Sequence, residues 1–309
     1  MNPRTIKIIA GIFLSNVCST VAIGLVKFGS ARIDGSGTLV FSMFFIIPFL
    51  MGMFYGWQWR DMKLGTWAII GWCTISTITA CLMSFVFLQE GYLCLLIVFP
   101  VIIAMMVTGA LIGRMLYRNK NNTLNSSVVG VAVLIFIADV ASQHSSTMVV
   151  SDTFVVNAPV EKVWPYVVEY DPITLKENYV LFKIGMPSPV QSTVDGHETG
   201  AGRKCIFSNG YVFDEKMIVY KPNEELTFDI IAQPRDPEIM GHIDITRGQF
   251  ILKDNGDGTT TLTGNSWYTL HVFPSWYFDL WAESVTRNVH LRVMEHIKTL
   301  SEHDVQVHR

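Results

Sequence analysis

Long apolar stretches in the first 143 residues limit what this chain can fold into. A helix that spans the hydrocarbon core of a bilayer needs about 20 mostly apolar residues. Five stretches approach that length: Ile6–Val26, Thr38–Trp57, Leu64–Leu88, Tyr92–Leu116 and Ser127–Ala141. They predict a transmembrane domain of about five helices over residues 1–143, and hence a multi-pass protein of the cell membrane.

The composition and the distribution of charge agree with a membrane protein. Hydrophobic residues make up 50% of the chain and charged residues only 16%, whereas soluble domains carry about 25% charged residues. Up to Gln143 there are nine Lys and Arg against four Asp and Glu, and from His144 onward fourteen against twenty-two. An acidic carboxy-terminal half argues against nucleic acid as a partner, because phosphates require a basic surface. It also argues against electrostatic docking on anionic lipid.

Basic residues between the apolar stretches predict the orientation of the membrane domain. One side carries Arg4, Lys7, Arg60, Lys63, Arg114, Arg118 and Lys120, and the other only Lys27 and Arg32. Because basic loops remain in the cytoplasm, the amino terminus is expected inside, and five spans then place the soluble domain on the non-cytoplasmic side. If Ser127–Ala141, which is short and contains Asp139, is only an interfacial helix, the soluble domain is cytoplasmic instead.

Three further features of the membrane half bear on its packing and chemistry. Glu90 and Asp139 lie near the ends of their stretches, so we expect them to face water at the interface rather than to form a proton relay. Gly109 and Gly113 have the spacing of a helix contact made through small residues.

From Thr147 onward the pattern changes to that of an α+β domain, expected over residues 148–302 with a tail at 303–309. Met148–Val156 alternates as a strand. Asn157 and Pro159 then introduce a helix, because Asn caps helices and Pro is tolerated in the first helical turn. That helix carries Val160, Val163, Trp164, Val167 and Val168 on one face, which is typical of packing on a core.

A long antiparallel meander and a final helix are predicted to complete this domain. The strands are expected at Arg203–Ser208, Tyr211–Lys221, Glu225–Ala232, Ile245–Lys253 and Thr259–Val272. Turn residues such as Asn209-Gly210 separate them. The last helix runs from Ser275 to about Ser301. We expect one apolar stripe of it to cover the sheet: Phe278, Trp281, Val285, Val289, Val293, Ile297 and Leu300.

This order of elements resembles the START-like superfamily, also known as the polyketide cyclase or SRPBCC group. The segments that carry the resemblance are Asn157–Trp164, Gly200–Arg203 and His290–Lys298, and Cys205–Gly210 with Gly264–Tyr268 resemble its membrane-anchored branch. The resemblance implies a helix-grip fold, in which a curved antiparallel sheet surrounds the long C-terminal helix with an apolar cavity between them. The group shares no catalytic motif, so the resemblance implies no catalytic residue.

Large apolar side chains on the sheet and the last helix are predicted to line that cavity. They are Phe213, Met217, Phe228, Phe250, Tyr268, Trp281 and Val285. The expected function is membrane-tethered binding, sensing or transfer of a hydrophobic small molecule or lipid, because the tether holds the cavity beside the bilayer where such ligands concentrate. The competing interpretation is that these side chains only fill a core.

Two other classes of function remain open. A cyclase or hydrolase would need a titratable group in the enclosed site, and Glu215 and His290 are the candidates, although neither has an evident partner in the sequence. Trp267 lies on an otherwise polar strand face and would anchor a protein-docking surface, unless a β-bulge returns it to the core. No protein partner is identified. Cys205 is the only cysteine of the soluble half, so no zinc site, other metal or cofactor is expected.

Overall fold

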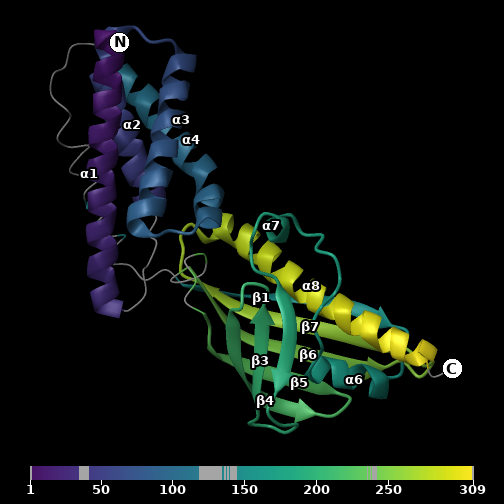
Figure 1. Cartoon of the computed structure of the whole chain (residues 1–309). Coiled ribbons are helices and arrows are strands. Elements are labelled where there is room, and N and C mark those ends of the chain that lie inside the picture. The colour runs from purple at the N-terminus through teal and green to yellow at the C-terminus, as the bar shows by residue number, and fades with distance from the viewer. Residues whose placement is uncertain are drawn as a thin grey trace. The chain divides into compact units, whose positions relative to one another are not determined.

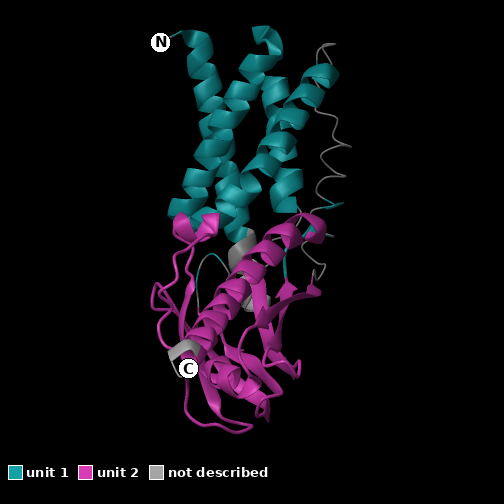
Figure 2. Cartoon of the chain, turned by 90° about the vertical axis from the view of Figure 1, so that its right-hand side faces the viewer, with its two compact units in different colours: residues 1–144, 236–242, 271–274 teal, residues 145–235, 243–270, 275–309 magenta. Residues whose placement is uncertain are grey.

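The fold is described from a computed structural model of the chain (Figure 1). It covers residues 2–34, 42–117, 145–234 and 242–307, together with Leu134, Ile135, Ile137, Asp139, Asp236 and Glu238. The chain forms two compact units (Figure 2). Unit 1 contains residues 1–144, 236–242 and 271–274, and unit 2 contains residues 145–235, 243–270 and 275–309.

Unit 1 is built from apolar helices. They are α1 (Pro3–Asp34), the π-helical turn η1 (Ser42–Ile46) leading into α2 (Ile47–Gln58), α3 (Thr66–Met83) continuing through η3 (Ser84–Leu88), and α4 (Tyr92–Tyr117). Within the described residues, three stretches are long and apolar enough to cross a membrane: Pro3–Leu25, Thr66–Leu88 and Tyr92–Tyr117. Ser42–Gln58 is a shorter apolar helix. The fifth predicted span, Ser127–Ala141, lies largely outside the described residues.

The two carboxylates predicted to face water in this unit are both largely buried. Asp139 is buried, and its Oδ2 accepts a hydrogen bond from the backbone N–H of Ser42 at 2.6 Å. Asp139 therefore accepts from an N–H group at the start of a helical segment. Such groups lack a partner within the helix, and a negative charge is favourable there. The Glu90 side chain is 10% exposed, and its Oε2 lies 3.9 Å from His242 Nε2. The expectation of water-facing residues is wrong for Asp139, because its charge has a structural partner.

Glycines allow α2 and α4 to pack with their backbones in contact. Gly52 and Gly56 of α2 face Gly109 and Gly113 of α4, and a Cβ added at any of the four would lie less than 3.0 Å from a backbone atom of the other helix. Without a hydrophobic driving force in lipid, such close backbone packing is a main source of helix association. The predicted role of the Gly109/Gly113 spacing is confirmed, and Gly52 and Gly56 supply the matching surface.

Replacing Gly109 by leucine is expected to separate these helices. The new side chain would collide with the backbone of α2, and overpacking of this kind costs about 1–3 kcal/mol. The melting temperature of the detergent-extracted protein should therefore fall for Gly109→Leu. Gly71→Leu is the matched control, because Gly71 lies in α3 with no neighbouring atom within 4 Å of an added Cβ. Equal melting of both variants would contradict the contact.

Unit 2 is a curved, seven-stranded antiparallel sheet with a long C-terminal helix, consistent with a helix-grip fold (Figure 1). The strand order is β1-β7-β6-β5-β4-β3-β2. The strands are β1 (Ser146–Val156), β2 (Pro189–Val194), β3 (Gly202–Phe207), β4 (Val212–Lys221), β5 (Glu225–Ala232), β6 (Ile243–Asp254) and β7 (Thr260–Leu270). The helices are α6 (Val160–Val168), α7 (Val180–Lys183) and α8 (Ser275–Val307).

One face of the sheet and the two longer helices enclose the main core of unit 2. All five residues predicted on the apolar face of α6 are buried. They pack with Met217, Leu226, Phe228 and Phe250 of the sheet and with Val293, Met294 and Ile297 of α8. β2 is absent from the strands predicted from the sequence, because Pro187 and Pro189 lie at its start.

The face that α8 buries differs from the predicted stripe. The buried residues are Ala282, Thr286, His290, Val293, Met294, His296, Ile297 and Ser301, whereas Trp281 is 37% exposed. Ala282 packs with Val150, Tyr268 and Leu270. The ring of Tyr268 occupies the sheet side of this contact, so a small side chain faces it from the helix. The helix also continues to Val307 rather than ending near Ser301.

Alanine substitutions distinguish the observed face of α8 from the predicted one. Ile297 is fully buried, so Ile297→Ala should destabilise the protein by about 2–5 kcal/mol through lost burial and a new cavity. Trp281→Ala should cost clearly less, because the indole is partly solvated. Denaturant unfolding followed by fluorescence measures both changes. A larger cost for Trp281→Ala than for Ile297→Ala would restore the predicted face.

Candidate ligand-binding site

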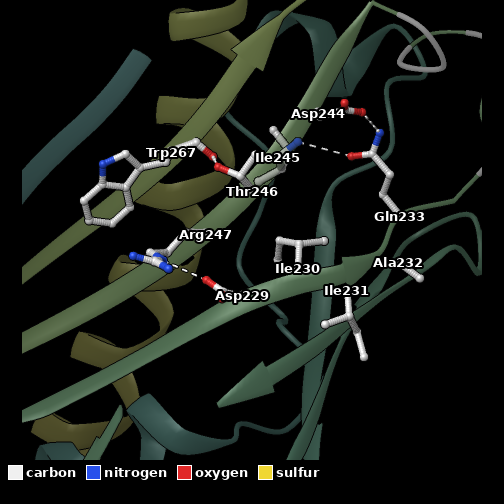
Figure 3. A pocket seen from close by; sticks show the side chains of 10 residues that line it. All are labelled: Asp229, Ile230, Ile231, Ala232, Gln233, Asp244, Ile245, Thr246, Arg247 and Trp267. Carbon is white, nitrogen blue, oxygen red and sulfur yellow. Dashed lines mark hydrogen bonds and ion pairs between the residues drawn. The ribbon is translucent and has the colours of Figure 1, made fainter. Parts of the chain in front are cut away.

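A hollow of about 690 Å³ lies where β5 and β6 separate (Figure 3). Its ten lining residues are Asp229, Ile230, Ile231, Ala232, Gln233, Asp244, Ile245, Thr246, Arg247 and Trp267. Small-molecule pockets in proteins typically measure about 300–1,000 Å³. The hollow therefore has the size of a ligand site.

The separation of the two strands has a local cause. Backbone pairing between β5 and β6 ends at Asp229 and Arg247, and the register between β6 and β7 shifts between Ile245 and Arg247. Such a bulge adds one residue, here Thr246, and bends the strand. Beyond the bulge, the side-chain amide of Gln233 bridges the gap between β5 and β6. Its Nε2 donates to Ile243 O at 3.1 Å, and its Oε1 accepts from the Ile245 N–H at 3.2 Å.

The hollow combines an apolar surface with two polar ends. Arg247 donates to Asp229 across one end at 2.7 Å, and Gln233 donates to Asp244 at the other at 2.8 Å (Figure 3). Isoleucines and Trp267 supply the apolar part. The bulge lies in β6 and not in β7, so Trp267 is not returned to the core and its side chain remains at this surface.

The seven residues predicted to bind a ligand are not among those that line the hollow. Met217, Phe228 and Phe250 lie in the main core, and Tyr268 lies in the second core cluster. Phe213 is half-buried, and its ring lies 5.0 Å from that of Phe207. On α8, Val285 is half-buried and Trp281 is exposed. Their role in ligand binding stays a prediction.

A buried ion pair lies on the inner face of the sheet between β3 and β4. The Arg203 guanidinium donates to the carboxylate of Glu215, and the two side chains are 3% and 5% exposed. Arg203 also donates to Val168 O at 3.1 Å and lies 4.6 Å from the centre of the Phe228 ring. Burial raises the pKa of Glu215, while the adjacent Arg203 opposes that rise.

Two further polar side chains lie at this side of the sheet: Cys205 of β3, and Ser192 of β2, which is its partner in the register. Ser192 of β2 is 2% exposed, and its Oγ has no hydrogen-bond partner among the described residues. Burial, reinforced by the Glu215 carboxylate, raises the pKa of the Cys205 thiol to about 12. The thiol is therefore neutral at pH 7 and unsuited to act as a nucleophile, which requires a thiolate.

His290 forms a second polar position in the interior, on α8. It is 5% exposed, and neither ring nitrogen has a hydrogen-bond partner in the described part of the chain. Its Nδ1 lies 3.7 Å from Asp152 Oδ2. Gly264 of β7 provides the space for the ring, because an added Cβ there would collide with His290 Nε2. One turn earlier, Thr286 is 6% exposed, and its Oγ1 also has no hydrogen-bond partner among the residues that the structure describes.

The charge state of His290 follows from burial. Burial lowers the pKa of His290 to about 4, against the opposing influence of Asp152. Asp152 already accepts a hydrogen bond from Arg287. The positive charge of Arg287 lowers the pKa of His290 further. At pH 7 the imidazole is neutral, so it offers one hydrogen-bond donor and one acceptor. It suits contact with a hydroxyl or carbonyl group rather than with an anion.

The described residues offer little for a metal. No group of three or more His, Cys, Asp or Glu side chains among them is arranged to hold a metal ion.

Comparison with solved structures finds similar proteins at low sequence identity. Norcoclaurine synthase from Thalictrum flavum, in complex with dopamine and hydroxybenzaldehyde, is 12% identical, covers 53% of this chain and 90% of its own, and has a TM-score of 0.36. The ZhuI aromatase/cyclase from Streptomyces sp. R1128 is 12% identical over 52% of this chain and 96% of its own, with a TM-score of 0.36. An uncharacterized protein from Bacillus thuringiensis is 13% identical over 49% and 97%, with a TM-score of 0.35. No family profile and no curated protein matches the chain.

The lowered pKa of His290 predicts a loss of stability in acid. Between pH 6.5 and about 4 the unfolded chain binds a proton at this residue that the folded chain does not. The free energy of unfolding should therefore fall as the pH drops through this window, by up to about 1.4 kcal/mol per pH unit. His290→Gln should flatten this dependence in thermal melts at pH 7.5 and pH 5.

An exposed histidine on the same helix supplies the control. His303→Gln changes a solvated ring and should leave the pH dependence of melting as it is in the parent protein. If His290→Gln and His303→Gln have equal effects, His290 is not the group responsible.

Proposed function

We propose that this protein is a membrane-tethered module that binds, senses or transfers a hydrophobic small molecule or lipid between the sheet and α8. The proposed ligand surface includes Phe213, Met217, Phe228, Phe250, Tyr268, Trp281 and Val285. Three apolar helices of spanning length support the tether. Beside a bilayer, such a module meets ligands at the concentration they have in the membrane.

The observation that carries the proposal is the presence, in an aromatic interior, of buried polar groups that have no hydrogen-bond partner among the described residues. Thr286 and His290 lie on the buried face of α8, and the His290 ring lies 6.1 Å from that of Phe250. More than about 90% of buried polar groups in native proteins are hydrogen-bonded. An unsatisfied group costs about 1–3 kcal/mol. An amphipathic ligand with one hydroxyl or carbonyl group would supply the missing contact.

The side of the membrane is part of the proposal. Seven of the nine basic residues in the first 143 residues fall on one side of the predicted spans, which favours a non-cytoplasmic location for unit 2.

A cyclase or hydrolase is the second candidate function. It is favoured by the two titratable groups named from the sequence, since each has a charged neighbour in the interior: Glu215 is paired with Arg203, and His290 lies near Asp152. A neutral imidazole in an enclosed site can accept a proton from a bound hydroxyl. Turnover of a bound compound, rather than its retention, would distinguish the enzyme from the binding module.

Protein docking is the third candidate function, and the hollow between β5 and β6 favours it. Trp267 lines this hollow together with Ile231, which is 64% exposed. Large aromatic residues in pockets are common anchors of protein interfaces.

Thr286→Val tests the binding proposal, because valine has nearly the same shape as threonine and lacks the hydroxyl. If a ligand contacts Oγ1, less of a defined small molecule should co-purify with the variant, as measured by mass spectrometry of the detergent-extracted protein. If the interior is only a core, removing an unsatisfied hydroxyl should instead raise the melting temperature.

The control is Thr299→Val on the exposed side of the same helix, where the threonine hydroxyl donates to Glu295 O. It should leave the co-purified material unchanged. A parent protein with no defined bound molecule, together with a Thr286→Val variant that is more stable, would exclude the binding module.

A further inference from the structure

Five large apolar side chains on α7, on the residue that follows it and on the start of α8 are exposed, and we refer to them as the interfacial surface. They are Val180 and Ile184, which are 64% and 45% exposed, and Trp276, Leu280 and Trp281, which are 69%, 65% and 37% exposed. Apolar exposure on this scale usually marks a surface that contacts another molecule or a membrane.

The two parts of the interfacial surface are connected within unit 2. The hydroxyl groups of Tyr179 and Ser284 lie 3.0 Å apart and join the start of α7 to α8. Leu181 and Phe182 of α7 are buried, so the short helix is held in place while Val180 and Ile184 remain exposed. Figures 1 and 2 both place α7 and the start of α8 at the same end of unit 2.

That end of unit 2 is also where the chain enters it from unit 1. β1 begins at Ser146, which pairs with Leu270 at the end of β7. α8 begins at Ser275, five residues after Leu270. The start of α8, which carries part of the interfacial surface, therefore follows closely after the strand end that pairs with the start of β1. The start of β1 is where the chain enters unit 2 from the apolar helices.

The chemistry of the surface suits a lipid interface better than a charged partner. Trp is enriched where the hydrocarbon core meets the headgroups, because its ring is apolar and its N–H is polar. The nearby acidic groups on α8 already accept hydrogen bonds: Asp279 from Tyr268, and Glu283 from Arg287. The acidic composition of this half of the chain argues against attraction to anionic lipid as the driving force.

We infer that the interfacial surface inserts into the headgroup region of the bilayer in which unit 1 is embedded. The ligand class is thus the neutral phospholipid interface, bound by apolar and aromatic contact. This inference rests on the proposed membrane tether. It adds a second membrane contact, made by unit 2 itself.

Spin labels on single cysteines test the inference in the full chain, reconstituted in phosphatidylcholine nanodiscs. Leu280→Cys and Ile184→Cys report on the interfacial surface, in a parent protein whose five native cysteines, Cys18, Cys73, Cys81, Cys94 and Cys205, are replaced by alanine. Power saturation compares collision with oxygen, which partitions into lipid, and with a water-soluble nickel chelate. Both labels should gain oxygen collision and lose nickel collision relative to Val155→Cys. Val155 is 51% exposed and lies near the other end of β1, opposite Thr261.

A label at Phe13, which is 64% exposed on α1, separates the failure of this inference from failure of the tether. If Phe13→Cys is accessible to oxygen while Leu280→Cys and Ile184→Cys collide with nickel as Val155→Cys does, the interfacial surface faces water and the inference is overturned. If both interfacial labels are shielded from both reagents, a protein surface covers them, which also overturns it. If Phe13→Cys itself collides with nickel, the tether and the inference fail together.

Discussion

The contact between α8 and the inner face of the sheet determines what unit 2 can do. A sheet with one apolar face must be covered, and α8 covers it with small and polar side chains as well as apolar ones. Ala282 lies against Tyr268, and His290 fits over Gly264. Large apolar residues at every contact position would produce a dry core. The polar positions instead give the interior hydrogen-bonding capacity, which is why we propose a ligand with both apolar and polar parts.

The sequence predicted those elements whose pattern is local. The buried face of α6 was predicted correctly because Val160, Val163 and Trp164 recur at helical spacing. β4 to β7 were predicted because apolar and polar residues alternate along them and turn residues separate them. β2 was missed because its first residue is Pro189 and Pro187 lies just before it. The face of α8 was misassigned because the prediction weighted side-chain size, whereas packing against Tyr268 selects Ala282 over Trp281. Such a choice depends on the opposing strand, which no local pattern contains.

The candidate site was harder to predict than the fold. On β4, Glu215 is two residues from buried Met217, so both side chains lie on the same face of the sheet. A charged residue on an apolar face indicates that a partner is buried with it. That partner is Arg203 on the adjacent strand. The hollow between β5 and β6 had no such signal, because it depends on the bulge at Thr246 and on the side chain of Gln233. The two sites support different proposals: the interior supports binding of a small ligand, and the hollow supports docking of a protein.

The buried ion pair between Arg203 and Glu215 has a consequence for how the strands align. These residues are direct partners in the register of β3 and β4, with Lys204 opposite Asp214 as the next pair. The side chains of Lys204 and Asp214 are 63% and 46% exposed. Because side chains alternate between faces, a slip of one residue in either strand would send one member of the buried pair to the solvent face and leave the other charge alone in the interior. Misaligned pairings are thus strongly disfavoured, and the ion pair selects one alignment at the side of the sheet that carries Ser192 and Cys205.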